Sequence, residues 1–510
     1  MTAGGRARPV VLVFLLLAAV QTSLALRAHL GAPRGTVFVG TFFYVDDFYN
    51  YLSYVEQAQR GALVFRNKLA PPEAPPALVN LEWLGIGWLS ALLGVAPLLA
   101  YRLAGLAALA ALVALADRWL LRSGVAPSRR LAGLLLVFTG GGLGGILFAL
   151  RLLPGERAMD VRTGAFPFVA ALANPHFVIG TALLLGALSA YAAGRPWRGA
   201  LLGTVLGLAR PYDAALLAGI EALAVAAGGP PRTWPRRLLP VVALGPVLAY
   251  DAWVLLAGPG FRAFSSPRYA ALSPSPLDLA IALGPAALLA LSAFRHGAGR
   301  DGKEPAHRLR LALWALLAVG VVAAHPLSFS LQFIVGAGLP LLLLGAVGLS
   351  RVRRPGALEA AVPLMATTAV VVAWLCAWPG PTRLVPAERW RVAEALRPLC
   401  RPGDVVLSPP DVGLYVSGLT PCWAFVSHSA APEHEARAGA VRRFYGEASP
   451  EERRHLLDAS RAALVVLSLP RPPEGWLGGA PFEPRAEVPG LAGGLVVLAR
   501  DAARAGRPSP

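Results

Sequence analysis

Two adjacent carboxylates, Asp46 and Asp47, stand in the stretch FFYVDDFYNYLSYVEQ, shortly after an apolar run from Val10 to Leu30. A carboxylate in such a position can accept a proton from an attacking hydroxyl group. Aromatic residues surround the pair, and we expect two of them, Tyr44 and Tyr49, to contact a substrate. The chemistry that this stretch could perform is therefore general base catalysis beside a membrane.

Further polar residues stand at the ends of later apolar runs, in the stretches ANPHF, ARPYDA, FRAFSSPRY and HPLSFSLQF. A buried Arg or Asp costs about 2.5–3.5 kcal/mol at the centre of a membrane helix, so such residues point to function. Arg and His could stabilise a departing phosphate. Taken singly, each could instead begin or end a helix, as Asn or Arg before Pro often does. The predicted phosphate ligands are Arg210, His325 and His176; the predicted substrate contacts are Asn174, Tyr212, Asp213 and Gln332; and Arg262, Arg268, Tyr269 and Ser328 belong to the same stretches.

Membrane-spanning helices would have to position these side chains. Of the 510 residues, 55% are hydrophobic and only 15% are charged, and the mean hydropathy is +0.56. Apolar segments recur at the length of about 20 residues that a helix needs to cross a bilayer. They lack the alternation of a membrane β-barrel. The predicted fold class is an α-helical polytopic membrane protein with a small C-terminal α/β domain.

The net charge of +18 comes from arginines in short loops between the apolar runs. This pattern indicates topology and not nucleic-acid binding. Arg6 and Arg8 precede the first run, so we expect a cytoplasmic N-terminus, although a cleavable signal peptide is an alternative for that run. About eleven spans place the arginine clusters inside and the C-terminal domain outside the cytoplasm. They are predicted at residues 10–30, 99–120, 131–150, 174–193, 198–210, 212–228, 238–257, 277–294, 311–325, 331–350 and 357–378.

Composition also divides the chain into domains. Residues 1–378 form the predicted transmembrane domain, whose first outer loop, 31–98, carries the acid pair and a surface helix from Leu81 to Val95. Residues 379–502 form the predicted extracytoplasmic α/β domain, because charged residues become frequent and strand-like and helical patterns alternate. Strand-like runs begin at Asp404, Cys422, Ala463 and Gly493, helical stretches cover 388–396 and 433–444, and residues 503–510 are predicted to be disordered.

Two smaller patterns concern packing and redox state. Cys400 and Cys422 both fall in the predicted outer domain, where an oxidising compartment would permit a disulfide; two unpaired structural cysteines are the alternative. The glycine run TGGGLGG from Thr139 lies in a predicted span, where small residues let helices approach closely.

The arrangement resembles the GT-C superfamily of polytopic glycosyltransferases, the group that includes protein O-mannosyltransferases and the aminoarabinose transferases of lipid A. The resemblance rests on one span, an outer loop with VDDFYNYL, a Pro-rich entry APPALVNLEWLGIGWLSALLG into a surface helix, and the span LAYRLAGLAALAALVALADRWLLR before a basic turn. The RPYD and HPLSF segments look like those of uncharacterised bacterial members. The resemblance implies that Asp46 is the general base and Asp47 the second acid.

The resemblance also implies substrates and location. The donor would be a sugar on polyprenyl phosphate, and an inverting displacement would move that sugar to an acceptor hydroxyl at the outer face of the membrane. The acceptor would be an unidentified glycan, lipid or protein, and the location the bacterial inner (plasma) membrane within the cell envelope. No cofactor is certain. Because Asp-Asp replaces the more frequent Asp-Glu, a divalent metal at Asp46 and Asp47 is left open.

Two other classes of function compete with a transferase. A transporter or flippase of a lipid-linked substrate would also use polar groups and broken helices in the membrane. It should show polar residues along a path to the inner side, and few charges lie toward the cytoplasmic half of the predicted spans. A non-catalytic assembly protein has no need of an acid pair and basic residues at one membrane surface.

Overall fold

The computed structural model describes residues 3–69, 72–228, 230–258, 274–295, 304–326, 329–352, 354, 356–378, 380, 383–429, 431, 433–470, 473, 475–490 and 494–501. The chain divides into two compact units. We call Met1–Arg27, Arg102–Leu256 and Phe264–Trp378 the helical unit, and Ala28–Tyr101, Ala257–Ala263 and Pro379–Pro510 the α/β unit. Residues 28–101, which include the predicted outer loop, thus share one unit with the C-terminal residues, a grouping that the sequence did not reveal.

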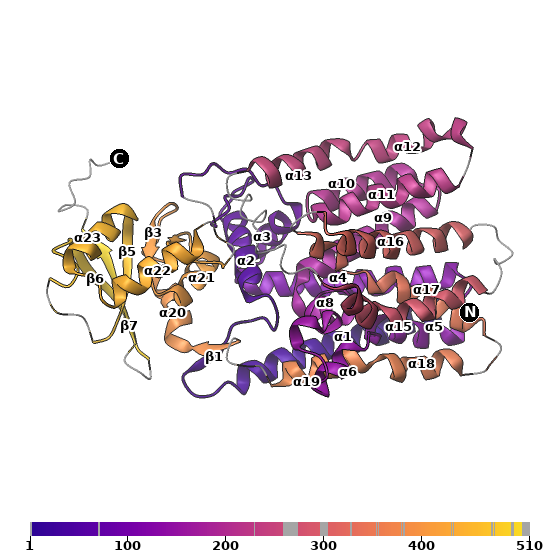
Figure 1. The fold of residues 1–510 in the computed structure, drawn as a ribbon, viewed down its shortest axis with the longest axis horizontal. Coiled ribbons are helices and arrows are strands. Elements are labelled where there is room, and N and C mark those ends of the chain that lie inside the picture. Colours follow the sequence, from indigo (N-terminus) through magenta and orange to yellow (C-terminus); the bar gives the residue numbers. More distant parts are fainter. Residues whose placement is uncertain are drawn as a thin grey trace. The chain divides into compact units, whose positions relative to one another are not determined.

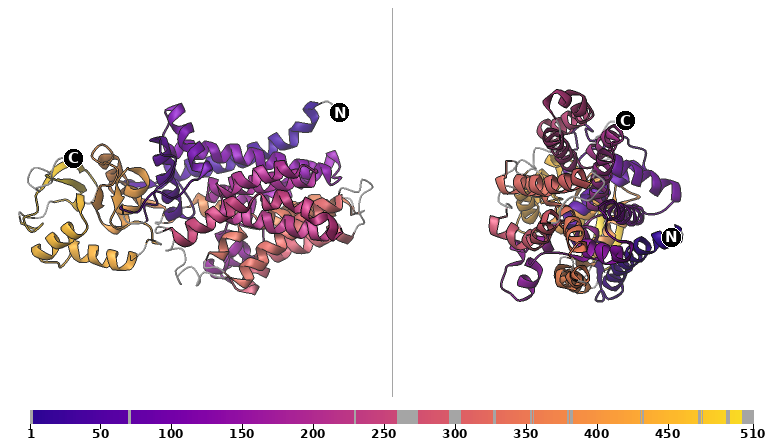
Figure 2. Two further views of the ribbon diagram at one scale, coloured as in Figure 1. Left: turned by 90° about the horizontal axis from the view of Figure 1, so that it is seen from above. Right: turned by 90° about the vertical axis from the view of Figure 1, so that its right-hand side faces the viewer.

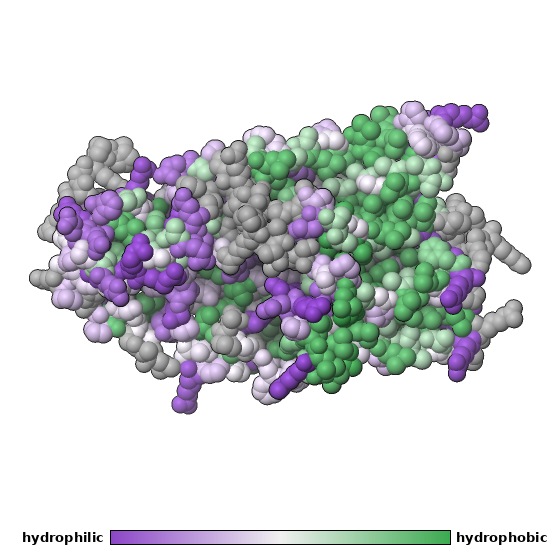
Figure 3. All heavy atoms as spheres, in the orientation of Figure 1, coloured by the Kyte–Doolittle hydropathy of each residue, from purple (hydrophilic) through white to green (hydrophobic). Residues whose placement is uncertain are grey.

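Long helices that run in roughly the same direction make up the helical unit (Figures 1 and 2). Its exposed side chains include many large apolar residues, such as Leu103, Leu288, Leu316 and Trp374, and apolar side chains cover much of its visible face in Figure 3. Exposed apolar surface of this kind suits contact with lipid. The helices are α1 (Ala3–Leu30), α4 (Pro97–Arg122), α5 (Arg130–Thr139), α6 (Gly144–Ala149), α7 (Met159–Arg162), α8 (Pro167–Ala173), α9 (Pro175–Ala192), α10 (Pro196–Gly207), α11 (Pro211–Ala227), α12 (Trp234–Val242), α13 (Gly245–Ala257), α15 (Pro276–Arg295), α16 (Glu304–Ala324), α17 (Gly338–Ser350), α18 (Ala357–Met365) and α19 (Thr367–Ala377). By the bounds of the units, α1 and α13 end in the α/β unit and α4 begins in it.

Seven helices in the described part of the chain are long and apolar enough to cross a membrane, or up to eight if the bent pair Pro231–Val242 and Gly245–Ala257 counts as one span. The prediction of a polytopic membrane protein is confirmed, whereas the number of eleven spans stays a prediction. The predicted span at 198–210 corresponds to α10, which has only 12 residues. Helix α3 (Leu81–Leu93) has 13 residues, which at 1.5 Å per residue is too short to cross a membrane. This length agrees with the prediction of a surface helix there.

The prediction of one continuous span over residues 131–150 is wrong. Helix α5 ends at Thr139 and α6 begins at Gly144, because the backbone amides between them bond to other segments. Gly141 donates to the carbonyl of Met365, and Gly142 donates to the Thr368 hydroxyl over 3.1 Å. A Cβ on Gly141 would lie 2.2 Å from the Thr368 Oγ1, so the glycine run does permit close packing, as predicted.

The α/β unit is built on a five-stranded mixed sheet of order β4-β3-β5-β7-β6. Strands β3 (Val405–Leu407), β4 (Trp423–Ala424) and β5 (Ala462–Ser468) are parallel, and β7 (Leu495–Arg500) and β6 (Phe482–Val488) continue the sheet antiparallel. The four strands predicted from apolar runs are confirmed. Strand β6 was missed because it carries Pro484 and charged residues, a composition that only an edge strand tolerates.

Helices cover both faces of this sheet. Helices α20 (Ala387–Leu396) and α21 (Pro410–Leu419) bury Val392, Leu396, Val412 and Val416 against one face, which presents Leu464 and Val466. Helices α22 (His434–Tyr445) and α23 (Pro450–Ala459) bury Val441, Phe444 and Leu457 against the other, which presents Val465 and Leu467. Alternate residues of β5 thus face opposite cores, as the period of a strand requires.

The segment between α1 and α4 belongs to the same unit and joins it through two elements. Strand β1 (Thr36–Phe38) pairs antiparallel with β2 (Leu384–Pro386). Helix α2 (Val45–Gln59) packs against α3 and α21. A Cβ on Gly418 of α21 would lie 2.7 Å from the Tyr49 ring, so glycine there lets α21 approach α2 closely. This packing holds α2 against the C-terminal segment.

Candidate active site

The acid pair lies in the first turn of α2. Tyr44 turns the chain into this helix with a left-handed backbone, φ 50°, which is uncommon for a residue other than glycine. Asp46 and Asp47 follow at the end where free backbone N–H groups carry partial positive charge. Both carboxylates are half-buried. The helix start therefore explains how two adjacent negative charges are tolerated in this position.

The acid pair is held by His428 and Ser429, which follow strand β4 in the chain. The Ser429 hydroxyl donates to Asp46 Oδ2 over 2.9 Å, and the Ser429 backbone amide donates to the same oxygen over 3.3 Å. His428 Nε2 lies 3.1 Å from Asp47 Oδ1, and the His428 side chain is only 5% exposed. Both carboxylates are thus oriented by partners from the C-terminal part of the chain. Sequence reasoning missed His428 and Ser429, since a His-Ser pair after an apolar run is a weak signal.

Tyr49 and Tyr415 are buried side chains of the α/β unit. The Tyr49 hydroxyl donates to the Val39 carbonyl over 2.8 Å and accepts from Trp390 Nε1 over 3.0 Å. The ring of Tyr49, 2% exposed, contacts that of Tyr415 edge-on. Burial raises the pKa of Tyr415 to about 12, and the carboxylates of Asp411 and Asp46 act in the same direction. The structure therefore places Tyr49 in the core of the unit, while Tyr44 remains half-buried beside the carboxylates.

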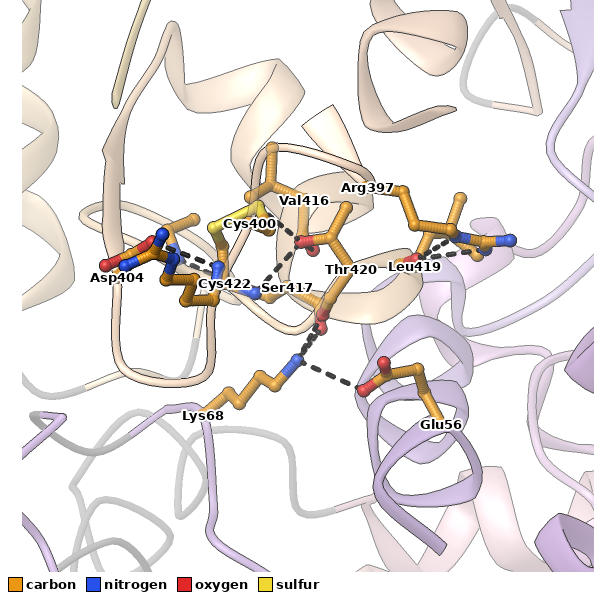
Figure 4. Close-up of a disulfide and its surroundings, with 12 residues drawn as sticks. Glu56, Lys68, Arg397, Cys400, Asp404, Val416, Ser417, Leu419, Thr420 and Cys422 are labelled. Atoms are coloured by element: carbon orange, nitrogen blue, oxygen red, sulfur yellow. Dashed lines mark hydrogen bonds and ion pairs between the residues drawn. A yellow bond between two sulfur atoms is a disulfide. The ribbon is translucent and has the colours of Figure 1, made fainter. Parts of the chain in front are cut away.

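A buried lysine connects the chain segment after α2 to α21 (Figure 4). Lys68 Nζ donates to the carbonyls of Ser417, over 3.0 Å, and Thr420, and lies 3.9 Å from Glu56 Oε2 on α2. Burial lowers the pKa of Lys68 to about 8 against the opposing effect of Glu56. A disulfide between Cys400 and Cys422 closes the loop beside Thr420, so the bonded alternative predicted for these cysteines is the one in the structure.

A second group of predicted residues belongs to the helical unit. We call it the Arg210 cluster, and it consists of Asn174, His176, Arg210, Asp213 and Gln332. Arg210 precedes α11, and its Nε lies 2.9 Å from Asp213 Oδ2 within the same helix turn. Arg210 Nη2 donates to the Gln332 carbonyl over 2.9 Å. Asn174 caps α9 by accepting from the His176 amide over 3.2 Å, and His176 interacts electrostatically with Asp213. The structure brings these five predicted residues together.

The guanidinium of Arg210 is fully buried, at 0% exposure, and Arg210 Nη1 has no hydrogen-bond partner in the described part of the chain. Its carbon Cζ lies 5.1 Å from the centroid of the Phe177 ring. A Cβ on Gly180 would lie 2.5 Å from Arg210 Cδ, so that glycine makes room for the side chain. Arg210 therefore lies in a tight, ion-paired position.

The remaining predicted residues lie at the edges of this cluster. Tyr212 packs its ring 5.2 Å from that of Phe329 and 5.9 Å from that of Phe333. His325 directly follows α16 and has a left-handed backbone, φ 45°, and neither of its ring nitrogens has a hydrogen-bond partner among the described residues. The predictions for Arg262, Arg268, Tyr269 and Ser328 lie outside the described residues.

The donor set around the acid pair does not fit a metal site. Among the residues that the structure describes, no group of three or more His, Cys, Asp or Glu side chains could hold a metal ion. Asp46 and Asp47 each direct an oxygen toward a protein partner, Ser429 or His428. A metal at this pair stays a prediction from the sequence, and no step below depends on it.

Comparison with known proteins identifies the class of fold. No protein-family model and no curated protein matches the chain. A structure of the arabinofuranosyltransferase AftD from Mycobacteria superimposes with a TM-score of 0.53 at 17% identity, over 95% of this chain and 41% of AftD. A second AftD structure gives 0.52 at 17% identity, over 96% and 40%. This chain thus spans about two fifths of the length of AftD.

A match over nearly the whole of both chains comes from the apo structure of ArnT from Cupriavidus metallidurans. It superimposes with a TM-score of 0.53 at 15% identity, over 98% of this chain and 99% of ArnT. The chain therefore shares its fold with ArnT and with part of AftD, in agreement with the resemblance stated above.

Proposed function

We propose that this chain is an inverting glycosyltransferase that moves a sugar from a polyprenyl-phosphate donor to an acceptor hydroxyl at the outer face of the membrane. The observation that carries the proposal is the acid pair at the start of α2, oriented by Ser429 and His428. The GT-C fold supports it, and the name of AftD, an arabinofuranosyltransferase, supports sugar transfer as the reaction class.

Asp46 is the proposed general base. A carboxylate oxygen of Asp46 takes the proton of the acceptor hydroxyl group while the oxygen of that hydroxyl group attacks the anomeric carbon of the donor. The bond between the anomeric carbon and the phosphate oxygen breaks, and polyprenyl phosphate leaves with the electron pair. Ser429 fixes one oxygen of Asp46, which keeps the other directed at the acceptor. Asp47, held by His428, orients the same helix turn.

The Arg210 cluster is the proposed binding site for the donor phosphate. Arg210 Nη1 has no hydrogen-bond partner in the described chain, although the side chain is fully buried, so it could donate to a phosphate oxygen that reaches the cluster. His176 and His325 are the further proposed phosphate ligands. Asn174, Tyr212, Asp213 and Gln332, with Tyr44, are the proposed contacts to the rest of the substrate. The buried Tyr49 instead connects α2 to the Val39 carbonyl.

The proposed location is the inner (plasma) membrane of a bacterium, with a cytoplasmic N-terminus and the α/β unit outside the cytoplasm. The Cys400–Cys422 disulfide supports an oxidising compartment for this unit. A reporter that is active only in the cytoplasm, fused after Ala502, should give no signal. A strong signal would contradict the proposed topology.

The reaction is tested by incubating purified protein with a panel of polyprenyl-phosphate sugars and an envelope extract as acceptor source. Polyprenyl phosphate should be released from one donor, and the new glycosidic bond should have the opposite anomeric configuration. Retained configuration would contradict the inverting displacement. Movement of intact donor across a reconstituted bilayer without release of polyprenyl phosphate would instead favour a transporter or flippase.

A further inference from the structure

A pocket of about 470 Å³ lies in the α/β unit. Its walls come from Lys68, from the residues before β3 and β5, from β4 and the residues after it, and from the first turn of α22. This volume falls in the range of about 300–1,000 Å³ that is typical of small-molecule sites. The reaction steps proposed above involve no residue of this lining.

Aromatic rings and cations line the pocket together. Lys68 Nζ lies 5.8 Å from the centroid of the Trp423 ring. On the neighbouring wall, Arg437 Cζ lies 5.6 Å from the centroid of the Phe425 ring. Aromatic faces carry negative charge density and attract C–H groups as well as cations. Such walls suit a ring with C–H faces and charged substituents.

A third cation, Arg461, stands at the turn before β5. Its Nη1 lies 2.8 Å from Glu73 Oε1, and both side chains are well exposed. Exposed ion pairs contribute little, about 0–1 kcal/mol, so a bound anion could replace Glu73 at modest cost. Arginine binds a carboxylate or a phosphate through two parallel hydrogen bonds. Arg437 likewise has an exposed partner, Glu433 at 3.5 Å. The three cations Lys68, Arg437 and Arg461 outnumber the lining carboxylates of Glu73 and Asp404, so the pocket is suited to an anionic group.

We propose that this pocket binds the acceptor, through a sugar ring that carries an anionic substituent. The inference rests on the proposed function and specifies its acceptor. The C–H face of the ring packs on Trp423 or Phe425, while Arg437 and Arg461 bind its carboxylate or phosphate. The acceptor is thus an acidic saccharide rather than a neutral one.

Chain continuity connects the pocket to the acid pair. Ser427 lines the pocket, and the next two residues, His428 and Ser429, contact Asp47 and Asp46. Consecutive Cα atoms are about 3.8 Å apart, so the lining at Ser427 lies within about 8 Å of Ser429 along the backbone. If one sugar ring of the acceptor is bound in this pocket, the sugar units attached to it would therefore lie close to the general base, Asp46.

Saturation-transfer NMR on the full-length protein in detergent tests the proposal with three probes. Methyl glucuronide carries a carboxylate, glucose 6-phosphate carries a phosphate, and methyl glucoside is neutral. At least one acidic probe should bind at least about tenfold more tightly than the neutral probe. Arg437→Gln should weaken that binding about tenfold or more, because it removes a charge-assisted hydrogen bond. Arg442→Gln on the same helix, which does not line this pocket, is the matched control and should bind normally.

Two further results would overturn the assignment. Equal binding of all three probes would remove the preference for an acidic saccharide. Acidic-probe binding that survives Arg437→Gln and Trp423→Leu would place the site elsewhere. In either case donor turnover that depends on Asp46 would leave the proposed function standing. Conversely, normal probe binding to a protein that turns over no donor would contradict the proposed function and not the pocket.

Discussion

Ser429 donates two hydrogen bonds to one oxygen of Asp46, from its hydroxyl group over 2.9 Å and from its backbone amide over 3.3 Å. The two residues are 383 positions apart in the sequence. The C-terminal segment therefore contributes directly to the orientation of an acid in the first turn of α2. A site assembled from both segments depends on the α/β unit for its geometry.

Ser429→Ala should lower kcat about ten- to hundredfold, because a hydrogen bond to a charged group contributes about 1.5–3 kcal/mol. The KM for the donor should change little, since Ser429 acts through Asp46. Ser429→Thr restores a hydroxyl group and should recover most of the rate. Steady-state kinetics of the three proteins check this expectation. A KM effect without a kcat effect would show that Ser429 binds substrate instead.

His428 and Asp47 should behave as a coupled pair. His428→Leu removes the partner of Asp47, and Asp47→Asn removes the charge that faces His428. Since each change breaks the same contact, the double variant should lose less activity than the two single losses combined. A double-mutant cycle on kcat should give a coupling energy of about 0.5–3 kcal/mol. Strict additivity would show that the contact has no role in the reaction.

Arg210→Ala should cost about 3–5 kcal/mol of unfolding free energy, because it leaves the Asp213 carboxylate buried without its partner. The paired change Arg210→Met with Asp213→Leu should cost less, since no charge is then left unpaired. Arg232→Ala, at an exposed arginine of the same unit, is the control. Thermal unfolding in detergent measures all three. If Arg210→Ala is as stable as the wild type but no longer binds the donor, Arg210 binds substrate and does not stabilise the fold.

Because of Lys68, the free energy of unfolding should depend on pH in the alkaline range. Its pKa is lowered to about 8 in the folded protein from 10.5, so the folded state releases this proton first as the pH rises. The unfolded state binds more protons between about pH 8 and 10.5, and the free energy of unfolding should therefore increase across this window, by up to about 3 kcal/mol. Urea unfolding of the wild type and of Lys68→Met, compared at each pH, isolates this contribution. Identical pH slopes for the two proteins would contradict it.

Local patterns predicted much of the fold, and long-range contacts explain what was missed. Apolar runs in the C-terminal segment predicted β3, β4, β5 and β7 because their side chains face a core. The break between α5 and α6 could not be predicted, since it depends on bonds from Gly141 and Gly142 to residues more than 220 positions away. Composition alone cannot reveal such partners.

The candidate site shows the same division. The type and spacing of Asp46 and Asp47 marked them as candidate acids, and the structure places them at a helix start. Their partners, His428 and Ser429, were missed because hydrogen bonds across more than 380 residues leave no local pattern. Arg210 and Asp213 were identified, but their full burial as an ion pair follows only from packing against Gly180 and Phe177.

The most direct test of the account compares the rate of transfer by Asp46→Asn with that of the wild type and of Asp458→Asn, a control at an exposed carboxylate of α23. Release of polyprenyl phosphate is measured with the donor that the wild type uses. Asp46→Asn keeps the shape of the side chain but loses the basic oxygen, so we expect normal folding and a rate about a hundredfold to ten-thousandfold lower. Asp458→Asn should retain the full rate. A folded Asp46→Asn protein that transfers sugar at the wild-type rate would contradict the assignment of Asp46 as the general base.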